Sequence, residues 1–172
     1  MPLALNFSPR DWRQIAELIT VSAMLQQYGD GERIGTYPDS ISGFQQRNAP
    51  FLNPEDILVN VMALQGHDPD VKSARLKRAA GDVVISSGAQ ILNPHSAPEG
   101  LRFQIDFFPG ENSHTLVVGL NPRAVRVNGA ALPESIEPLR TQPGWWWDDK
   151  RGRLFLTARH DQTNVDVEVE AR

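Results

Sequence analysis

After residue 72, hydrophobic residues recur at every second position, and this period constrains the fold more than any other feature of the sequence. Residues 101–107 read Leu-Arg-Phe-Gln-Ile-Asp-Phe, and residues 165–169 read Val-Asp-Val-Glu-Val. Successive side chains of a strand point to opposite faces of its sheet, so this alternation gives one apolar face and one polar face. Both stretches are therefore predicted to be antiparallel strands that bury one face.

Turn signals separate further strand candidates in the same part of the chain. Asn128-Gly129 follows the run Val-Arg-Val and predicts a two-residue hairpin turn, while Asp149-Lys150-Arg151-Gly152 predicts a type I turn with a glycine bulge. The strand candidates lie at residues 74–79, 82–86, 101–107, 114–120, 124–127, 135–139, 144–148, 153–159 and 165–169. We therefore expect an antiparallel β-sandwich of seven to nine strands.

Residues 1–72 follow helical patterning instead. Ser8-Pro9 is a cap-and-proline start signal for a helix over about residues 9–28, whose apolar positions recur at spacings of three and four. Asn53-Pro54 repeats the signal for a second helix that ends at Gly66. The chain is thus expected to be mainly β, with two α-helices before the β-sandwich.

The connection between the predicted helices, residues 29–51, is long. Helix pairs are usually joined by about two to eight residues, and longer ordered loops are often functional. We divide the chain into a helical segment at residues 1–72 and a β-sandwich domain at residues 73–172.

Composition and charge exclude several classes of function. The 172 residues include no cysteine, which removes disulfides, thiolate nucleophiles and cysteine-ligated zinc. Seventeen Lys and Arg against 21 Asp and Glu give a net charge of −4, whereas a surface that follows nucleic-acid phosphates needs a basic excess. The sequence shows no membrane span and no signal peptide, so we expect no nucleic acid and no membrane as partners, and the compartment stays open.

Catalytic and cofactor motifs are sparse. We find no Gly-x-Ser-x-Gly elbow and no glycine-rich nucleotide pattern, and the four histidines lie far apart, so neither a cofactor nor a metal is expected. Glycoside cleavage commonly uses two carboxylates. The weak catalytic candidates are Asp39 and Glu32 in the long connection, where Arg33 lies beside Glu32. Acidic residues beside glycine and proline more often form turns, and this alternative stays open.

The three consecutive tryptophans, Trp145-Trp146-Trp147, must divide between the two faces of a strand. In one interpretation the outer two fill the core beside Leu154 and Leu156, and Trp146 covers Phe155 on the other face. In another, Trp146 provides a surface on which a sugar ring can stack, because the indole has an apolar ring face and a polar N–H group. Trp146 and Phe155 are therefore candidate substrate-binding residues.

Several segments together resemble the C-terminal region of bacterial glycoside hydrolases and polysaccharide lyases. Residues 125–132 (Val-Arg-Val-Asn-Gly-Ala-Ala-Leu), 144–148 (Gly-Trp-Trp-Trp-Asp) and 152–156 (Gly-Arg-Leu-Phe-Leu) are similar to hairpins of the β-sandwich appended to such enzymes. The predicted helical pair with the loop 35–40 resembles the last helical pair of an (α/α) toroid. A complete toroid needs many more helices than the two placed here, which implies either a fragment or helices that only cover the sandwich.

The resemblance implies a parent protein that acts on polysaccharide or oligosaccharide, with the sandwich supporting the toroid. It also implies that the loop 33–40 approaches the sugar, which adds Arg33 and Tyr37 to the candidate substrate-binding residues. We expect a non-catalytic accessory or support module, whose partners are a glycan and either a missing helical domain or a second copy. Two alternatives stay open: a small carboxylate-dependent hydrolase or lyase, and a protein–protein assembly domain.

Overall fold

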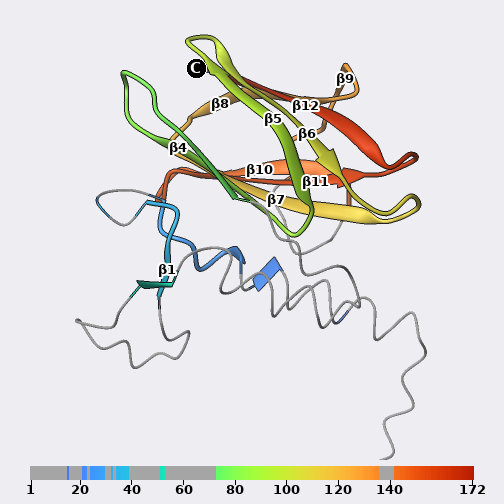
Figure 1. The fold of residues 1–172 in the computed structure, drawn as a ribbon, viewed down its shortest axis with the longest axis horizontal. Coiled ribbons are helices and arrows are strands. Elements are labelled where there is room, and N and C mark those ends of the chain that lie inside the picture. The colour runs from blue at the N-terminus through green and yellow to red at the C-terminus, as the bar shows by residue number, and fades with distance from the viewer. Residues whose placement is uncertain are drawn as a thin grey trace, which may run out of the picture.

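The computed structural model describes residues 15, 21–22, 24–29, 32, 34–38, 51–52, 73–135 and 142–172. Within them, two five-stranded antiparallel sheets face each other as a β-sandwich (Figure 1). The mainly β architecture predicted from the sequence is confirmed. The two predicted helices are not confirmed, because most of residues 9–28 and all of residues 54–65 lie outside the described part.

The first sheet has the strand order β10-β11-β7-β4-β3. Its strands are β10 (Gly144–Asp148), β11 (Arg153–Arg159), β7 (Asn112–Val118), β4 (Val83–Ser87) and β3 (Ser73–Leu76). A separate short pair, β1 (Tyr37–Pro38) with β2 (Phe51–Leu52), is also antiparallel.

The second sheet has the strand order β5-β6-β12-β8-β9. Its strands are β5 (Gln90–Ala97), β6 (Gly100–Asp106), β12 (Asn164–Ala171), β8 (Pro122–Val127) and β9 (Ala130–Ala131). The chain passes back and forth between the sheets, so β12 lies between β6 and β8 although it is the last strand in sequence.

The described part of the chain has ten strands in the sandwich, where seven to nine were expected. Strand β5 was missed because Asn93-Pro94 interrupts its hydrophobic alternation, and its register with β6 shifts between Leu92 and His95. Proline is tolerated there because β5 is an edge strand. Strand β9 has only two residues. The strand expected at residues 135–139 lies mostly outside the described residues.

Both predicted turns are confirmed. Asn128 and Gly129 have φ angles of 50° and 77°, as the two central residues of a type I′ turn require. In the β10–β11 turn, Arg151 N donates to Asp148 O at 3.2 Å, and Gly152 has a φ of 60°. The local glycine and asparagine therefore set both hairpins.

The main hydrophobic core lies between the sheets. It is formed by inward-facing residues of both, among them Val83, Ile85, Leu101, Phe103, Ile105, Val117, Val125, Trp145, Leu154, Leu156, Val165, Val167 and Val169. Burying one such side chain contributes about 1.5–3 kcal/mol. Trp147 packs against this core, whereas Trp146 packs against a second cluster with Phe155. The predicted division of the tryptophans, two inward and one outward, is confirmed.

The second cluster lies on the outer face of the first sheet. It joins sheet residues to residues near the start of the chain, namely Val21, Met24, Val84, Leu116, Val118 and Phe155, with Leu25, Ile34 and Trp146 packed against them. Figure 1 shows the described residues before position 40, drawn in blue, on the side of β10, β11 and β7 that faces away from the second sheet. We call residues 21–36, as far as they are described, the docked segment.

Candidate functional site

Trp146 and Phe155, two of the predicted substrate-binding residues, are brought together as directly opposed partners on β10 and β11. Phe155 is only 1% exposed, because Val21 and Met24 of the docked segment belong to the same cluster. Trp146 is half-buried at its edge. These two aromatic residues therefore form part of the sheet surface on which the docked segment packs.

Of the other predicted site residues, Glu32 and Tyr37 belong to the described part of the chain. Glu32 is exposed, and Tyr37 belongs to β1, where it pairs with Leu52 of β2. Arg33 and Asp39 lie outside the described residues.

A buried arginine anchors the docked segment to the first sheet. The Arg153 side chain is 2% exposed, and its Nη1 donates to the backbone oxygens of Leu25 and of Gln27, the latter at 2.9 Å. Its Nη2 donates to Asp148 Oδ2 at 2.7 Å. Met24 has helical backbone, and Leu25 N donates to Val21 O at 3.0 Å, so the guanidinium meets carbonyls at the end of a helical turn. Positive charge is favourable at such an end.

Close backbone approach also fixes the docked segment. A Cβ atom added to Gly29 would lie 1.6 Å from Arg151 O, so only glycine fits against the β10–β11 turn. A Cβ on Gly35 would lie 2.7 Å from the side chain of Val84, and Gly35 has a φ of 80°. Tyr28 N donates to Thr36 O at 2.9 Å and Gly35 N donates to Tyr28 O at 2.8 Å. These two hydrogen bonds join the two ends of a loop within the docked segment.

Buried polar groups lie beneath the same segment. Gln27 Nε2 donates to Gly35 O and to Ser86 Oγ, each at 2.7 Å. His114 Nδ1 lies 3.0 Å from Thr157 Oγ1, and its ring stacks on Phe155 with centroids 6.0 Å apart. Burial lowers the pKa of His114 from 6.5 to about 4, because a charged imidazole would lose its hydration there.

The outer face of the second sheet has the opposite character. His95, Arg102, Glu168 and Arg126 are successive cross-strand partners on β5, β6, β12 and β8. Arg102 Nε lies 3.3 Å from Glu168 Oε1; the arginine side chain is largely exposed and the glutamate side chain is partly exposed. A positive, a negative and a positive group thus follow one another across β6, β12 and β8.

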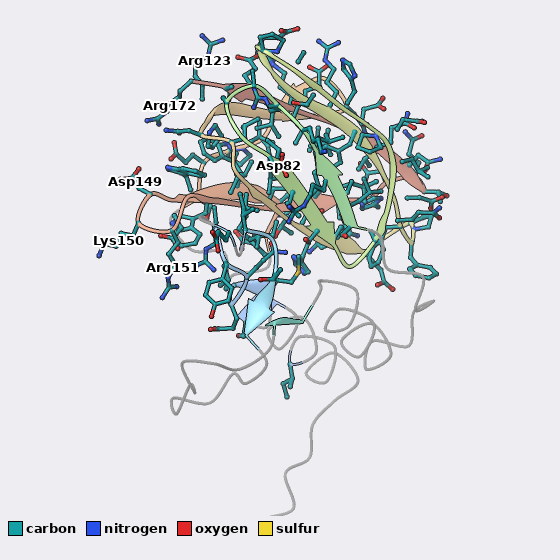
Figure 2. The ribbon with its side chains drawn as sticks, turned by 60° about the vertical axis from the view of Figure 1, so that its left-hand side comes forward. Asp82, Arg123, Asp149, Lys150, Arg151 and Arg172 are labelled. Atoms are coloured by element: carbon teal, nitrogen blue, oxygen red, sulfur yellow. The ribbon has the colours of Figure 1, made fainter. Side chains whose placement is uncertain are left out.

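A second set of charges extends this row. Glu170 accepts hydrogen bonds from Arg123 Nη2 at 2.7 Å and from Arg126 Nε at 3.3 Å. The hydrogen bond from Arg123 and then that from Arg126 lower the pKa of the Glu170 carboxyl below its ordinary value. Figure 2 shows Arg123 projecting outward near Arg172, whereas the turn of Asp149 to Arg151 projects from the other sheet.

A pocket of about 310 Å³ lies among these charged residues. It is lined by residues of the β5–β6 hairpin, of β8 and of β12, namely His95, Ala97, Glu99, Gly100, Leu101, Arg102, Arg123, Glu168, Val169 and Glu170. We call it the charged pocket. Its volume is near the lower end of the range of about 300–1,000 Å³ that is usual for ligand sites.

Sequence reasoning missed both Arg153 and the charged pocket. The spacing of Asp148 and Arg153 across a predicted hairpin turn makes them opposed partners, which is a signal for their pairing. Alternation in residues 101–107 and 165–169 likewise places Arg102 and Glu168 on an outward face. The sequence does not show which strands are neighbours, so it could not bring β6, β8 and β12 together at one pocket.

Two searches bear on metals and membranes. Within the described residues, no group of three or more His, Asp or Glu side chains is arranged to hold a metal ion. In the same part of the chain, no helix has the length and apolar character needed to cross a bilayer.

A scan against protein-family models, a search of curated proteins and a search of solved structures each gave no significant match to this chain.

Proposed function

We propose that this chain is a non-catalytic support module of a carbohydrate-active enzyme, in which the β-sandwich holds a preceding helical part against the outer face of its first sheet. The observation that carries this proposal is the burial of Arg153 between the sheet and the docked segment. Its guanidinium binds two backbone carbonyls of the segment and a carboxylate of the sheet at once.

The apolar character of this sheet face supports a docking role. Leu116, Val118 and Phe155 point away from the main core and are at most 1% exposed. Without a cover, these side chains would form an apolar patch of the kind that marks contact sites on soluble proteins. The docked segment covers them, and the glycines at positions 29 and 35 let its backbone approach the sheet closely.

Two hairpins support the assignment to a carbohydrate-active parent. Residues 125–132, whose motif resembles the appended sandwich of glycoside hydrolases and lyases, contain the β8–β9 hairpin. Residues 144–148 and 152–156 belong to the β10–β11 hairpin, which receives the docked segment. The resembling motifs therefore lie in hairpins of both sheets, one of them at the proposed docking site.

The state of the acidic residues favours a role without catalysis. A general acid in glycoside cleavage needs a carboxyl with a raised pKa. The pKa of Glu170 is instead lowered by Arg123 and Arg126, and Asp148 is paired with Arg153. The Glu170 carboxyl is thus stabilised in the ionised form, and the Asp148 carboxylate serves to hold the anchoring arginine.

Hydrogen–deuterium exchange on the full chain tests the docking role. The variant Arg153→Met leaves the Asp148 carboxylate and the carbonyl of Gln27 without their partner, and breaking such a buried pair costs about 3–5 kcal/mol. We expect the amides of Tyr28 and Gly35 to exchange much faster, with β12 still protected. The control is Arg159→Met, because Arg159 lies on the same strand and face but is exposed.

Two results would count against the proposal. The first is unchanged exchange at Tyr28 and Gly35 in Arg153→Met; should that variant fail to fold, Arg153→Lys, which keeps the charge but not the forked geometry, must show the same local loss. The second is release of reducing sugar from polysaccharides by the full chain that disappears in Asp39→Asn, since this would assign catalysis to the carboxylate.

A further inference from the structure

We propose that the charged pocket on the outer face of the second sheet is a binding site for a neutral oligosaccharide. This inference rests on the carbohydrate-related function proposed above, and it moves the glycan site from Trp146 and Phe155 to the opposite side of the sandwich. The pocket lies on β5, β6, β8 and β12, which take no part in holding the docked segment.

The paired charges of the pocket offer both hydrogen-bond donors and acceptors at the surface. The side chains of Arg102 and Arg123 are 74% and 70% exposed, and those of Glu168 and Glu170 are 39% and 34% exposed. A guanidinium has five N–H donors and a carboxylate has about four lone-pair sites, so each ion pair leaves many of them unused. A sugar hydroxyl can donate to the carboxylate and accept from the neighbouring guanidinium at the same time.

The walls of the pocket also present apolar atoms. Ala97, Leu101 and Val169 line it together with the charged side chains. A pyranose ring has C–H groups on its faces and hydroxyls around its rim, so it matches a surface that combines both kinds of atom. A ligand that is wholly apolar or wholly ionic would leave one of these two parts of the wall unmatched.

The charge balance disfavours an anionic ligand. Glu99, Glu168 and Glu170 provide three negative charges, and Arg102 and Arg123 provide two positive charges. Both arginines already pair with glutamates of the pocket, at 3.3 and 2.7 Å. A phosphate, sulfate or uronate group would have to displace an ionised glutamate, whereas a hydroxyl can join an existing pair without breaking it.

The backbone at one edge of the pocket is held by hydrogen bonds from neighbouring residues. Arg78 Nη2 donates to Ala97 O at 3.1 Å and to Pro98 O at 3.2 Å, which ties the β5–β6 turn to the neighbouring sheet edge. Ala171 N donates to Glu99 O at 2.9 Å, which ties the same turn to β12. A backbone held in this way loses little conformational freedom on binding, which favours affinity.

An NMR titration of the full-length chain tests this inference. Neutral xylo-, cello- and manno-oligosaccharides are added one at a time to the ¹⁵N-labelled protein. We expect at least one of them to shift the amide signals of residues 95–102 and 168–170 and to leave those of Tyr28 and Gly35 unchanged. The double variant Arg102→Ala/Glu168→Gln should weaken the binding at least tenfold.

The matched control is Arg75→Ala/Asp82→Asn. Arg75 and Asp82 also form an exposed ion pair at 3.3 Å, but neither residue lines the pocket, and Arg75 Nη2 donates to Ile34 O of the docked segment at 3.0 Å. The control variant should bind the oligosaccharide as the unchanged chain does. Equal weakening in both double variants would assign the effect to general loss of charge and would overturn the proposal.

Further outcomes decide between this inference and the proposed function. No shift with any neutral oligosaccharide at millimolar concentration would overturn the inference, as would shifts at the pocket with oligogalacturonate alone. Shifts centred on Trp146 would return the glycan to the first sheet. None of these results changes the exchange behaviour expected for Arg153→Met, so the support role stands or fails separately.

Discussion

The two outer faces of the sandwich differ although the two inner faces are alike. Both inner faces are apolar and share one core. The outer face of the first sheet is also apolar and is covered by the docked segment, whereas the outer face of the second sheet carries exposed ion pairs and the charged pocket. The inner faces are thus needed for folding, and the contrast between the outer faces indicates what each side of the molecule contacts.

The difference is visible in the burial of successive residues along the strands. Strand β7 is buried at six consecutive positions, Ser113 to Val118, and β11 is buried from Arg153 to Ala158. Strand β12 alternates, with buried Val165, Val167 and Val169 between more exposed acidic residues. A strand covered on both faces reads as a continuous buried run, and a strand open on one face reads as an alternation.

The largest expected effect is the loss of stability when a buried side chain of the covered face is truncated. Phe155→Ala removes a fully buried ring that contacts both the sheet and the docked segment, and such truncations cost about 3–5 kcal/mol. Urea unfolding of the full chain measures the difference. The control Phe108→Ala, at a ring that is 43% exposed, should cost about 1 kcal/mol or less. Equal losses in the two variants would show that the docked segment does not bury Phe155 in solution.

An intermediate effect is expected from acid, and it again concerns the covered face. The pKa of His114 is about 4 in the folded chain and 6.5 in the unfolded chain, so the unfolded state binds more protons between these values. The stabilisation from the neutral ring is therefore complete above pH 6.5 and is lost progressively as the pH falls from 6.5 to about 4. At about 1.4 kcal/mol per pKa unit, the total loss is about 3 kcal/mol.

Unfolding by urea at a series of pH values from 7 to 4 checks this expectation. His114→Gln should flatten the fall in stability over this range, because glutamine does not titrate. Burial also lowers the pKa of His160, so part of the fall should remain in that variant. A fall of the same size in the variant and in the unchanged chain would contradict the burial of His114.

The smallest effect is expected on the open face. Gln104 donates to Asp166 Oδ1 at 2.9 Å and accepts from Asn93 Nδ2 at 3.2 Å, but these groups are exposed and water can replace each bond. Gln104→Ala should change the free energy of unfolding by about 0.5 kcal/mol or less. A loss near that of Phe155→Ala would show that this face is covered too, and would remove the contrast between the sheets.

Much of the fold could be predicted from local sequence. Alternation located β6 and β12, and the Asn128-Gly129 and Gly152 turns set the hairpins they were expected to set. Strand β5 could not be predicted, because the Asn93-Pro94 irregularity is stabilised by pairing with β6 and by its position at a sheet edge. Edge position is a property of the assembled sheet and cannot be read from the sequence of the strand itself.

Less of the candidate site could be predicted. The division of the tryptophans followed from strand geometry, but the burial of Phe155 depends on residues more than 120 positions earlier in the chain. Arg153 illustrates the same limit, since an arginine beside apolar residues gives no sign that two backbone carbonyls will meet it. The contact is made by backbone carbonyls, so the side chains of Leu25 and Gln27 carry no signal of it.

The distance along the chain between Arg153 and its partner has a consequence for synthesis. Gln27 leaves the ribosome 126 residues before Arg153. At about 5–20 residues per second, the early segment waits roughly 6–25 s before its binding site is translated. During that interval the surface that packs against Val21 and Met24 lacks Phe155, and a chaperone or a neighbouring nascent chain has time to bind them. A slower codon stretch before β11 would therefore lengthen this exposure without changing a single contact in the folded protein.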